Sequence, residues 1–153
     1  MFGLAKILFG MIIRLDAGGL ASKIWQDKDV QATIVELNTR KQLYDKGIDS
    51  LGKPLRPPYT PFTIDHKLDV GLPDDRVTLY ETGAFHASFG VKPMPGGAEI
   101  VYDPYVINED GEFEDLRAKY GQDIIGLTEG SKAILADLMR EKMQILLKQT
   151  LKP

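Results

Sequence analysis

The N-terminal part of the chain has a strongly apolar, helical pattern. Residues 2–15 are apolar except for a narrow polar stripe at helical spacing, formed by Lys6, Gly10 and Arg14, which predicts a helix that other surfaces must cover. Its uninterrupted apolar run, 7–13, is too short to span a bilayer, and no small-residue cleavage pattern follows it. We expect this helix to remain in the mature protein and to pack in its own domain or on a neighbouring subunit. Only two cationic residues support the alternative of a membrane surface.

Helix start and stop signals divide most of the remaining chain. Short polar side chains accept the first free N–H groups of a helix, and glycine adopts the left-handed conformation that closes its last turn. These signals predict, in chain order, a helix near residues 20–25, the longest helix near 30–46 after a cap at Asp27 or Asp29, a short helix from Thr60-Pro61 to Gly71, another over 116–120 stopped by Gly121, and a final helix from Thr128 to about Gln149. The final helix is expected to bury a wide apolar face formed by Ile134, Leu135, Leu138, Met139, Met143, Ile145 and Leu146.

Alternating apolar positions replace the helical pattern in the middle of the chain. Alternation with a period of two is typical of strands with one buried face. It predicts strands near 77–81 and 85–92, then a third over "AEIVYDPYV", residues 98–106, with "PMPGG" as the turn before it. We therefore predict an α+β fold, in which a small antiparallel sheet or meander, about residues 77–107, is packed by N-terminal and C-terminal helices within a single domain, 1–153.

The strand pattern is interrupted at "ETG". Gly83 can adopt a positive φ, and Thr82 can hydrogen-bond locally where a ladder breaks, so we interpret this stretch as a corner or bulge that redirects the strand. The alternating positions that follow are expected to divide into two faces, with Phe85, Ala87 and Phe89 toward the core and His86 and Ser88 outward.

Two polar segments connect the predicted elements. The extended loop 46–61 lies within "DKGIDSLGKPLRPPYTP", which holds two glycines and four prolines. Because proline fixes its φ and donates no backbone hydrogen bond, this loop is predicted to be ordered extended chain or a mobile loop, not a core strand. The segment "DPYVINEDGEFED", residues 103–115, has six acidic residues and no basic one, and is expected to be a solvated loop.

Composition narrows the classes of function. A chain of 153 residues can bury a core of its own, so it needs no disulfide or metal to hold it. The absence of cysteine excludes disulfide frameworks, cysteine zinc sites and thiol nucleophiles. The net charge of −3 provides no overall positive field for non-specific binding of nucleic acid.

The candidate catalytic residues do not form a recognisable pattern. His66 and His86 lack the H-E-x-x-H spacing of a zinc site, and "HASFG" around Ser88 lacks the first glycine of a nucleophile elbow. The segments "NEDGEFED" and "DKGIDSLG" contain the acids of a calcium loop without its register. We therefore expect no catalytic residue, no cofactor and no metal site.

Several segments together suggest a family. "ELNTRKQLYDKGIDSLGKPL", "YTPFTIDHK", "DRVTLYETGAFHASFGV" and the tail beginning "DLRAKYGQD" resemble small virion proteins of tailed phages that infect Bacteroidetes, including crAss-like phages. The resemblance covers roughly residues 30–150, and "TGAFHASF" is similar to a strand of phage tail-completion and neck proteins. It implies a small α+β subunit assembled at the head–tail junction or in the tail, with no enzymatic residues to carry over.

Residues and resemblance together predict a non-enzymatic structural subunit of the virion, acting as a neck or connector ring or as a tail-completion protein. Its expected partners are copies of itself in a ring and the portal, neck or tail proteins of the same virion, without sequence-specific nucleic acid or a membrane. Assembly would take place in the cytoplasm of the bacterial host. The alternatives are a minor tail subunit, a small soluble enzyme with a site around His86, Tyr80 and Glu81, and a regulator that binds a host protein or nucleic acid.

Opposite charges indicate where contacts are expected. Ring subunits join two different faces, and opposite charge on those faces helps to set their register. We predict contact surfaces on the loop 46–61 and on the acidic segment 103–115, formed by Lys46, Lys53, Arg56, Tyr59, Tyr105, Asp110, Glu112 and Phe113.

Overall fold

The computed structural model of the protein describes residues 20–108 and 110–151. Its elements are, in chain order, α2 (Leu20–Gln26), α3 (Lys28–Glu36), the π-helix η1 (Leu37–Tyr44), α4 (Pro61–Asp69), α5 (Ala84–Ala87), β1 (Gly90–Met94), β2 (Gly97–Val101), β3 (Tyr105–Ile107), β4 (Phe113–Asp115), α6 (Leu116–Tyr120), the 3-10 helix η2 (Gln122–Ile124) and α7 (Glu129–Thr150). The apolar helix predicted over 2–15 lies outside the described residues.

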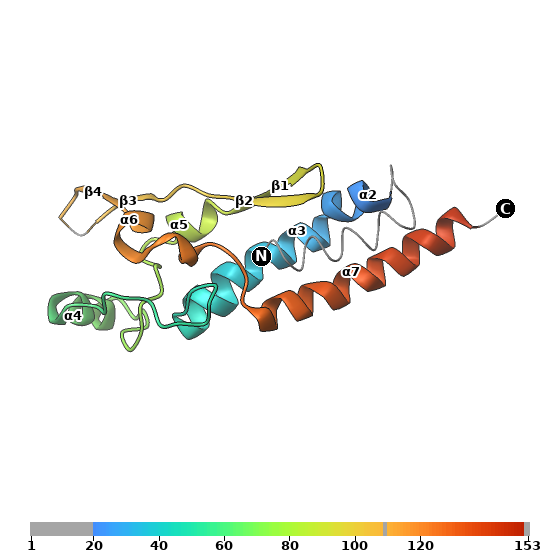
Figure 1. Cartoon of the computed structure of the whole chain (residues 1–153). Coiled ribbons are helices and arrows are strands. Elements are labelled where there is room, and N and C mark those ends of the chain that lie inside the picture. Colours follow the sequence, from blue (N-terminus) through green and yellow to red (C-terminus); the bar gives the residue numbers. More distant parts are fainter. Residues whose placement is uncertain (1–19, 109, 152–153) are drawn as a thin grey trace.

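Two antiparallel hairpins form one layer of the molecule, and the long helices form the other (Figure 1). β1 pairs with β2 and β3 pairs with β4, while α3 contacts α2, α7 and β1. The helix α4 lies at the same end as the β3–β4 hairpin, and α7 extends toward the opposite end (Figure 1). The predicted α+β class, with helices packed on a small antiparallel sheet, is confirmed. Within the described residues, however, the strands form two separate two-stranded sheets and not one meander.

Local capping explains why the helices begin where the sequence predicts them. Asp27 Oδ1 accepts hydrogen bonds from two N–H groups of the first turn of α3, at 2.9 and 3.0 Å. Thr60 and Thr128 each accept one from the N–H group three residues later, which starts α4 and α7. These capping predictions are confirmed. The prediction that the helix near 30–46 is the longest is wrong, because α7 has 22 residues.

The segment 77–81 is not a strand, contrary to the prediction. Its first three residues are buried one after another, so the chain runs through the interior without a solvent-facing side. Leu79 has a positive φ of 55°, which a strand does not allow. Side chains hold this backbone in place: the N–H of Thr78 donates to Tyr59 Oη at 3.0 Å, and His86 Nε2 donates to the Thr78 carbonyl at 2.8 Å.

The predicted strand over 85–92 is also wrong in its first half, which forms the short helix α5. Gly83 does adopt a positive φ, 87°, and Thr82 Oγ1 does accept a local hydrogen bond, from the first N–H of α5 at 3.2 Å. The corner therefore starts a helical turn. Phe85 and Phe89 are buried as predicted, whereas Ala87 is exposed. A spacing of four places two residues on one face in a strand and in a helix alike, so the two phenylalanines could not distinguish them.

Buried apolar side chains from both layers meet in one cluster. α7 contributes Leu135, Met139 and Met143 to it, as predicted. Ile134 and Ile145 are 56% and 46% exposed, so the buried face of α7 is narrower than predicted. Among the described elements α7 packs chiefly on α2 and α3, which cover one side of it.

Two buried amide side chains of η1 hold the segment that leads into α7. Asn38 donates to the Ile124 carbonyl at 3.0 Å and accepts from the Gly126 N–H at 2.8 Å. Gln42 donates to the Gly126 carbonyl at 2.8 Å and accepts from the Thr128 N–H at 2.9 Å. Both side chains are almost completely buried. Each amide therefore satisfies two backbone groups that would otherwise lack partners in the interior.

Candidate contact surfaces

The β3–β4 hairpin carries an exposed apolar face. Residues opposite each other in an antiparallel pair point to the same side, so the register places Tyr105, Ile107 and Phe113 on one face. Their exposed fractions are 57%, 63% and 81%. Large apolar side chains that gather on one exposed face mark a contact surface. We refer to these three residues as the hairpin face.

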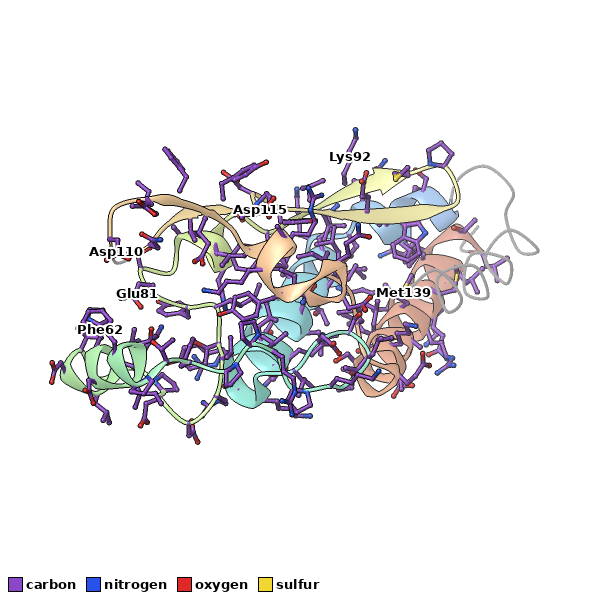
Figure 2. The ribbon with its side chains drawn as sticks, turned by 60° about the vertical axis from the view of Figure 1, so that its left-hand side comes forward. Phe62, Glu81, Lys92, Asp110, Asp115 and Met139 are labelled. Atoms are coloured by element: carbon purple, nitrogen blue, oxygen red, sulfur yellow. The ribbon has the colours of Figure 1, made fainter. Side chains whose placement is uncertain are left out.

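Acidic side chains surround the hairpin face. Asp110 lies at the tip of the hairpin (Figure 2), and Asp103 and Glu112 are exposed with it. Among the described residues, Asp110 and Glu112 take part in no ion pair, whereas the neighbouring Glu114 pairs with Lys119 at 2.7 Å. The charges of Asp110 and Glu112 are thus available to a partner.

The connector 46–61 is ordered by its own hydrogen bonds. Asp49 Oδ1 accepts from the N–H groups of Leu51 and Lys53, both at 2.9 Å. Leu55 is buried and fixes the far side of the turn to the core. Of the two alternatives that the sequence left open, ordered chain or mobile loop, the hydrogen bonds favour ordered chain.

An exposed leucine stands at the tip of this ordered turn. Leu51 is 62% exposed, and Lys46, Lys53 and Arg56 near it are exposed as well. None of these three cations belongs to an ion pair between described residues. We refer to the turn 49–53, together with Leu51 at its tip and the flanking cations Lys46, Lys53 and Arg56, as the cationic turn.

The hairpin tip and the cationic turn share one backbone geometry. In each turn, 49–53 and 108–112, the side chain of the first residue, Asp49 or Asn108, accepts hydrogen bonds from the backbone N–H groups two and four residues later. The backbone N–H of the first residue donates to the carbonyl of the fifth, at 2.9 Å in the turn 49–53 and 2.8 Å in the turn 108–112. The fourth residue is a glycine in both turns, with a φ of 79° or 80°. An antiparallel pair flanks each turn, Ile48–Pro54 in one and Ile107–Phe113 in the other.

Sequence reasoning missed this shared turn, although a signal for it exists. Both stretches read I-[DN]-x-x-G, in "IDSLGK" and "INEDGE". Both stretches contain the acids of a calcium loop without its register. In the structure, the Asp49 carboxylate and the Asn108 amide oxygen accept hydrogen bonds from backbone N–H groups of their own turn and so stabilise that turn. The solvated loop predicted over 103–115 is accordingly a hairpin with a defined turn.

Seven of the eight predicted contact residues are exposed, and Tyr59 is not. Its hydroxyl accepts from the Thr78 N–H at 3.0 Å, and the Lys67 ammonium lies 5.2 Å from the centre of its ring. Tyr59 therefore supports the buried stretch 77–79 within its own subunit. The other seven lie on the hairpin or in the cationic turn and its flanks, where a partner could reach them.

A group of polar side chains ties α4 to the end of the segment 77–81. Lys67 is only 3% exposed; its ammonium donates to the Tyr80 carbonyl and lies 3.0 Å from Glu81 Oε2. His66 Nε2 lies 2.5 Å from Glu81 Oε1. Partial burial opposes ionisation of Glu81, but hydrogen bonds and charge from Lys67 and His66 outweigh it, so the pKa of Glu81 is lowered. These contacts fasten the end of α4 to the body of the molecule.

His86 does not face outward as predicted. Its ring is half-buried and lies edge-on to Tyr44 and Tyr80, with ring centres 6.5 and 5.2 Å away. Burial lowers the pKa of His86; the hydrogen bond to the Thr78 carbonyl opposes this effect, and the charge of Lys67 adds to it. The neutral ring thus serves as a hydrogen-bond donor that holds the interior chain.

The stability of the protein should therefore decrease at mildly acidic pH. Because the folded-state pKa of His86 lies below its ordinary value of 6.5, the unfolded chain binds a proton more readily than the folded one. The contribution of His86 is fully present above about pH 6.5 and is lost as the pH falls through the lower folded-state pKa. Urea unfolding should give a lower free energy of unfolding at about pH 5.5 than at about pH 7.5. In His86→Gln the difference between the two pH values should be smaller.

The matched control is His66→Gln, which leaves His86 in place and should keep the decrease. A pH dependence that stays the same in His86→Gln and disappears in His66→Gln would contradict the assignment to His86.

The remaining candidates for chemistry give no reactive site. Ser88 Oγ donates to the Phe85 carbonyl at 2.6 Å and accepts from the Asp103 N–H at 3.0 Å, so its hydroxyl is hydrogen-bonded to the backbone on both sides. In the part of the chain that the structure describes, no group of three or more His, Cys, Asp or Glu side chains could hold a metal. A shallow groove between α3 and β1, with Val35 and Val91 in its lining, lies apart from both contact surfaces.

No helix within residues 20–108 and 110–151 has both the length and the apolar character needed to cross a membrane. Comparisons with family models, with curated proteins and with solved structures found no match to this chain. The hairpin face and the cationic turn are the two features from which a function can be inferred.

Proposed function

We propose that this chain is a non-enzymatic structural subunit of a tailed-phage virion, placed at the head–tail junction as a neck or connector ring or as a tail-completion protein. It would act by assembly with copies of itself and with portal, neck or tail proteins of the same particle. The proposed position in the virion rests on the resemblance of residues 30–150 to small virion proteins of tailed phages. The mode of action rests on the surfaces described above.

The observation that carries the mode of action is the hairpin face. Aromatic side chains are enriched in protein interfaces, where burial of their apolar area stabilises the complex. Tyr105, Ile107 and Phe113 are all more than half exposed and lie on a hairpin whose turn is fixed by Asn108. A preformed apolar surface loses little conformational entropy when a partner covers it, which favours association.

The geometry around His86 supports assembly over the competing enzymatic function. A general acid or base must reach a substrate with a free nitrogen or oxygen. His86 Nε2 already donates to the Thr78 carbonyl, and Glu81 is paired with Lys67 and His66. These groups are engaged in holding the interior segment, and the groove between α3 and β1 does not include them.

Analysis of the purified phage particles that carry this chain would test the position. Mass spectrometry should detect the protein in particles washed free of lysate, and electron microscopy with an antibody against the chain should label the head–tail junction. Label along the tail would favour the minor tail subunit instead. Absence of the chain from intact particles would overturn the proposal.

A further inference from the structure

We propose that the hairpin face of one copy docks on the cationic turn of a second copy of this chain. In this contact Leu51 packs among Tyr105, Ile107 and Phe113, while the cations around Leu51 lie opposite the acids around the hairpin face. The inference rests on the proposed function insofar as it takes the chain to be an assembling subunit, and it names the partner and the two surfaces that meet.

The apolar parts of the two surfaces are complementary in kind. Leu51 is a single exposed apolar side chain at the tip of a narrow turn, whereas the hairpin face presents three larger ones side by side. Each remains exposed to solvent in the isolated subunit. Contact between them removes apolar area from water on both sides, which is the main favourable contribution to association.

The charges of the two surfaces are opposite and unpaired within the subunit. Asp110 and Glu112 flank the hairpin face, and Lys53 and Arg56 flank Leu51; the ion pairs between described residues include none of these four. The Asp49 carboxylate, the acid nearest to Leu51 in the sequence, accepts hydrogen bonds from two backbone N–H groups. Complementary charge of this kind speeds the encounter and sets the register of a contact.

Hydrogen bonds within the subunit hold both surfaces in shape before they meet. The turns 49–53 and 108–112 are closed by the same set of side-chain and backbone hydrogen bonds, described above. In addition, the Ser50 N–H donates to the Asp123 carbonyl at 2.8 Å, which ties the cationic turn to the segment before α7. Little ordering is therefore required when the surfaces bind.

The placement of the two surfaces indicates a head-to-tail contact between copies. The hairpin lies in the upper layer at one end of the molecule, and the connector 46–61 lies below it, away from the hairpin tip, in both views (Figures 1 and 2). The two surfaces are therefore separate within one subunit. A contact between different patches repeats from copy to copy and produces a ring or a filament. A contact between two hairpin faces would instead bring Asp110 and Glu112 of one copy toward the same acids of the other, which is unfavourable.

Disulfide trapping tests this contact directly, because the chain contains no cysteine and every disulfide formed must involve an introduced one. Leu51→Cys in one preparation and Phe113→Cys in an isotope-labelled second preparation should, after mixing and mild oxidation, give heterodimers of mixed mass. Both positions are strongly exposed, so the substitutions should leave the fold intact, which circular dichroism would verify. The matched control replaces Phe113→Cys by Ile145→Cys, an exposed position on α7.

We expect a several-fold higher yield of heterodimer from Leu51→Cys with Phe113→Cys than from the control pair. Adding K53E and R56E to the Leu51→Cys chain should lower the yield, and adding D110K and E112K to the Phe113→Cys chain as well should restore it. Restoration is the decisive result, because it requires the two charged groups to face each other. A yield equal to that of the control, or a predominance of Phe113→Cys homodimers, would overturn the proposed contact.

This test and the test of the proposed function can fail independently. Trapping in solution does not depend on the virion, and detection of the chain in phage particles does not depend on which surfaces meet.

Discussion

Replacement of Asn38 by alanine should lower the free energy of unfolding by roughly 2–6 kcal/mol, because it leaves two buried backbone groups without partners and each costs about 1–3 kcal/mol. The two groups are the Ile124 carbonyl and the Gly126 N–H, which lie in the buried stretch before α7. Urea unfolding followed by the fluorescence of Trp25, the single tryptophan and a buried one, would measure the change.

Lys41→Ala is the matched control, since Lys41 lies in the same helical segment with its side chain exposed. This control should change stability by no more than about 0.5 kcal/mol. Because Asn38 and Gln42 both bind Gly126, the effect of Asn38→Ala combined with Gln42→Ala should differ from the sum of the single effects. A loss below about 1 kcal/mol in Asn38→Ala would show that the freed groups find other partners.

Reversal of the charges at the hairpin tip should have the largest effect on assembly. D110K together with E112K should weaken assembly by roughly tenfold or more, because the variant sets like charges against the cations around Leu51. Both side chains are exposed and unpaired within the described residues, so the subunit should keep its fold and its unfolding midpoint. Sedimentation of the full chain at increasing concentration, and incorporation into particles by complementation, would measure the loss.

The matched control for this variant is D65K with D69K. It makes the same change in net charge on exposed positions of α4, outside both contact surfaces. Assembly should weaken much less in this control than in the hairpin variant. Equal losses in the two variants would indicate a general effect of net charge, and unchanged assembly in D110K with E112K would remove the hairpin from the contact.

The predicted contact residues show what a charge pattern in the sequence can predict about exposure and what it cannot. The sequence placed acids in 103–115 and bases in 46–61, and both segments do present their charges to solvent. It could not separate Tyr59, which turns inward to Thr78, from Tyr105, which lies on an exposed strand face. The two tyrosines occur in similar polar, proline-containing stretches, and only the position of the segment 77–81 decides between them.

The sequence by itself determined the features that depend on a few neighbouring residues. Asp27, Thr60 and Thr128 start helices because each side chain reaches N–H groups two or three residues along the same chain. Gly83 precedes α5 and Gly121 ends α6, each with a positive φ, which glycine adopts readily because it has no side chain. The α+β class followed from the same local patterns.

Only the tertiary structure decided the course of the segment 77–92. Its alternating pattern suits a strand, but Tyr59, which lies 19 residues before Thr78, and His86, which follows the corner at Gly83, supply the hydrogen bonds that a neighbouring strand would have given Thr78. Likewise, local hydrogen bonds build the turns 49–53 and 108–112, but packing decides that Leu51 and Phe113 remain exposed. Partners distant in sequence cannot be read from local periodicity, because a buried polar group accepts any donor of suitable geometry that the fold brings to it.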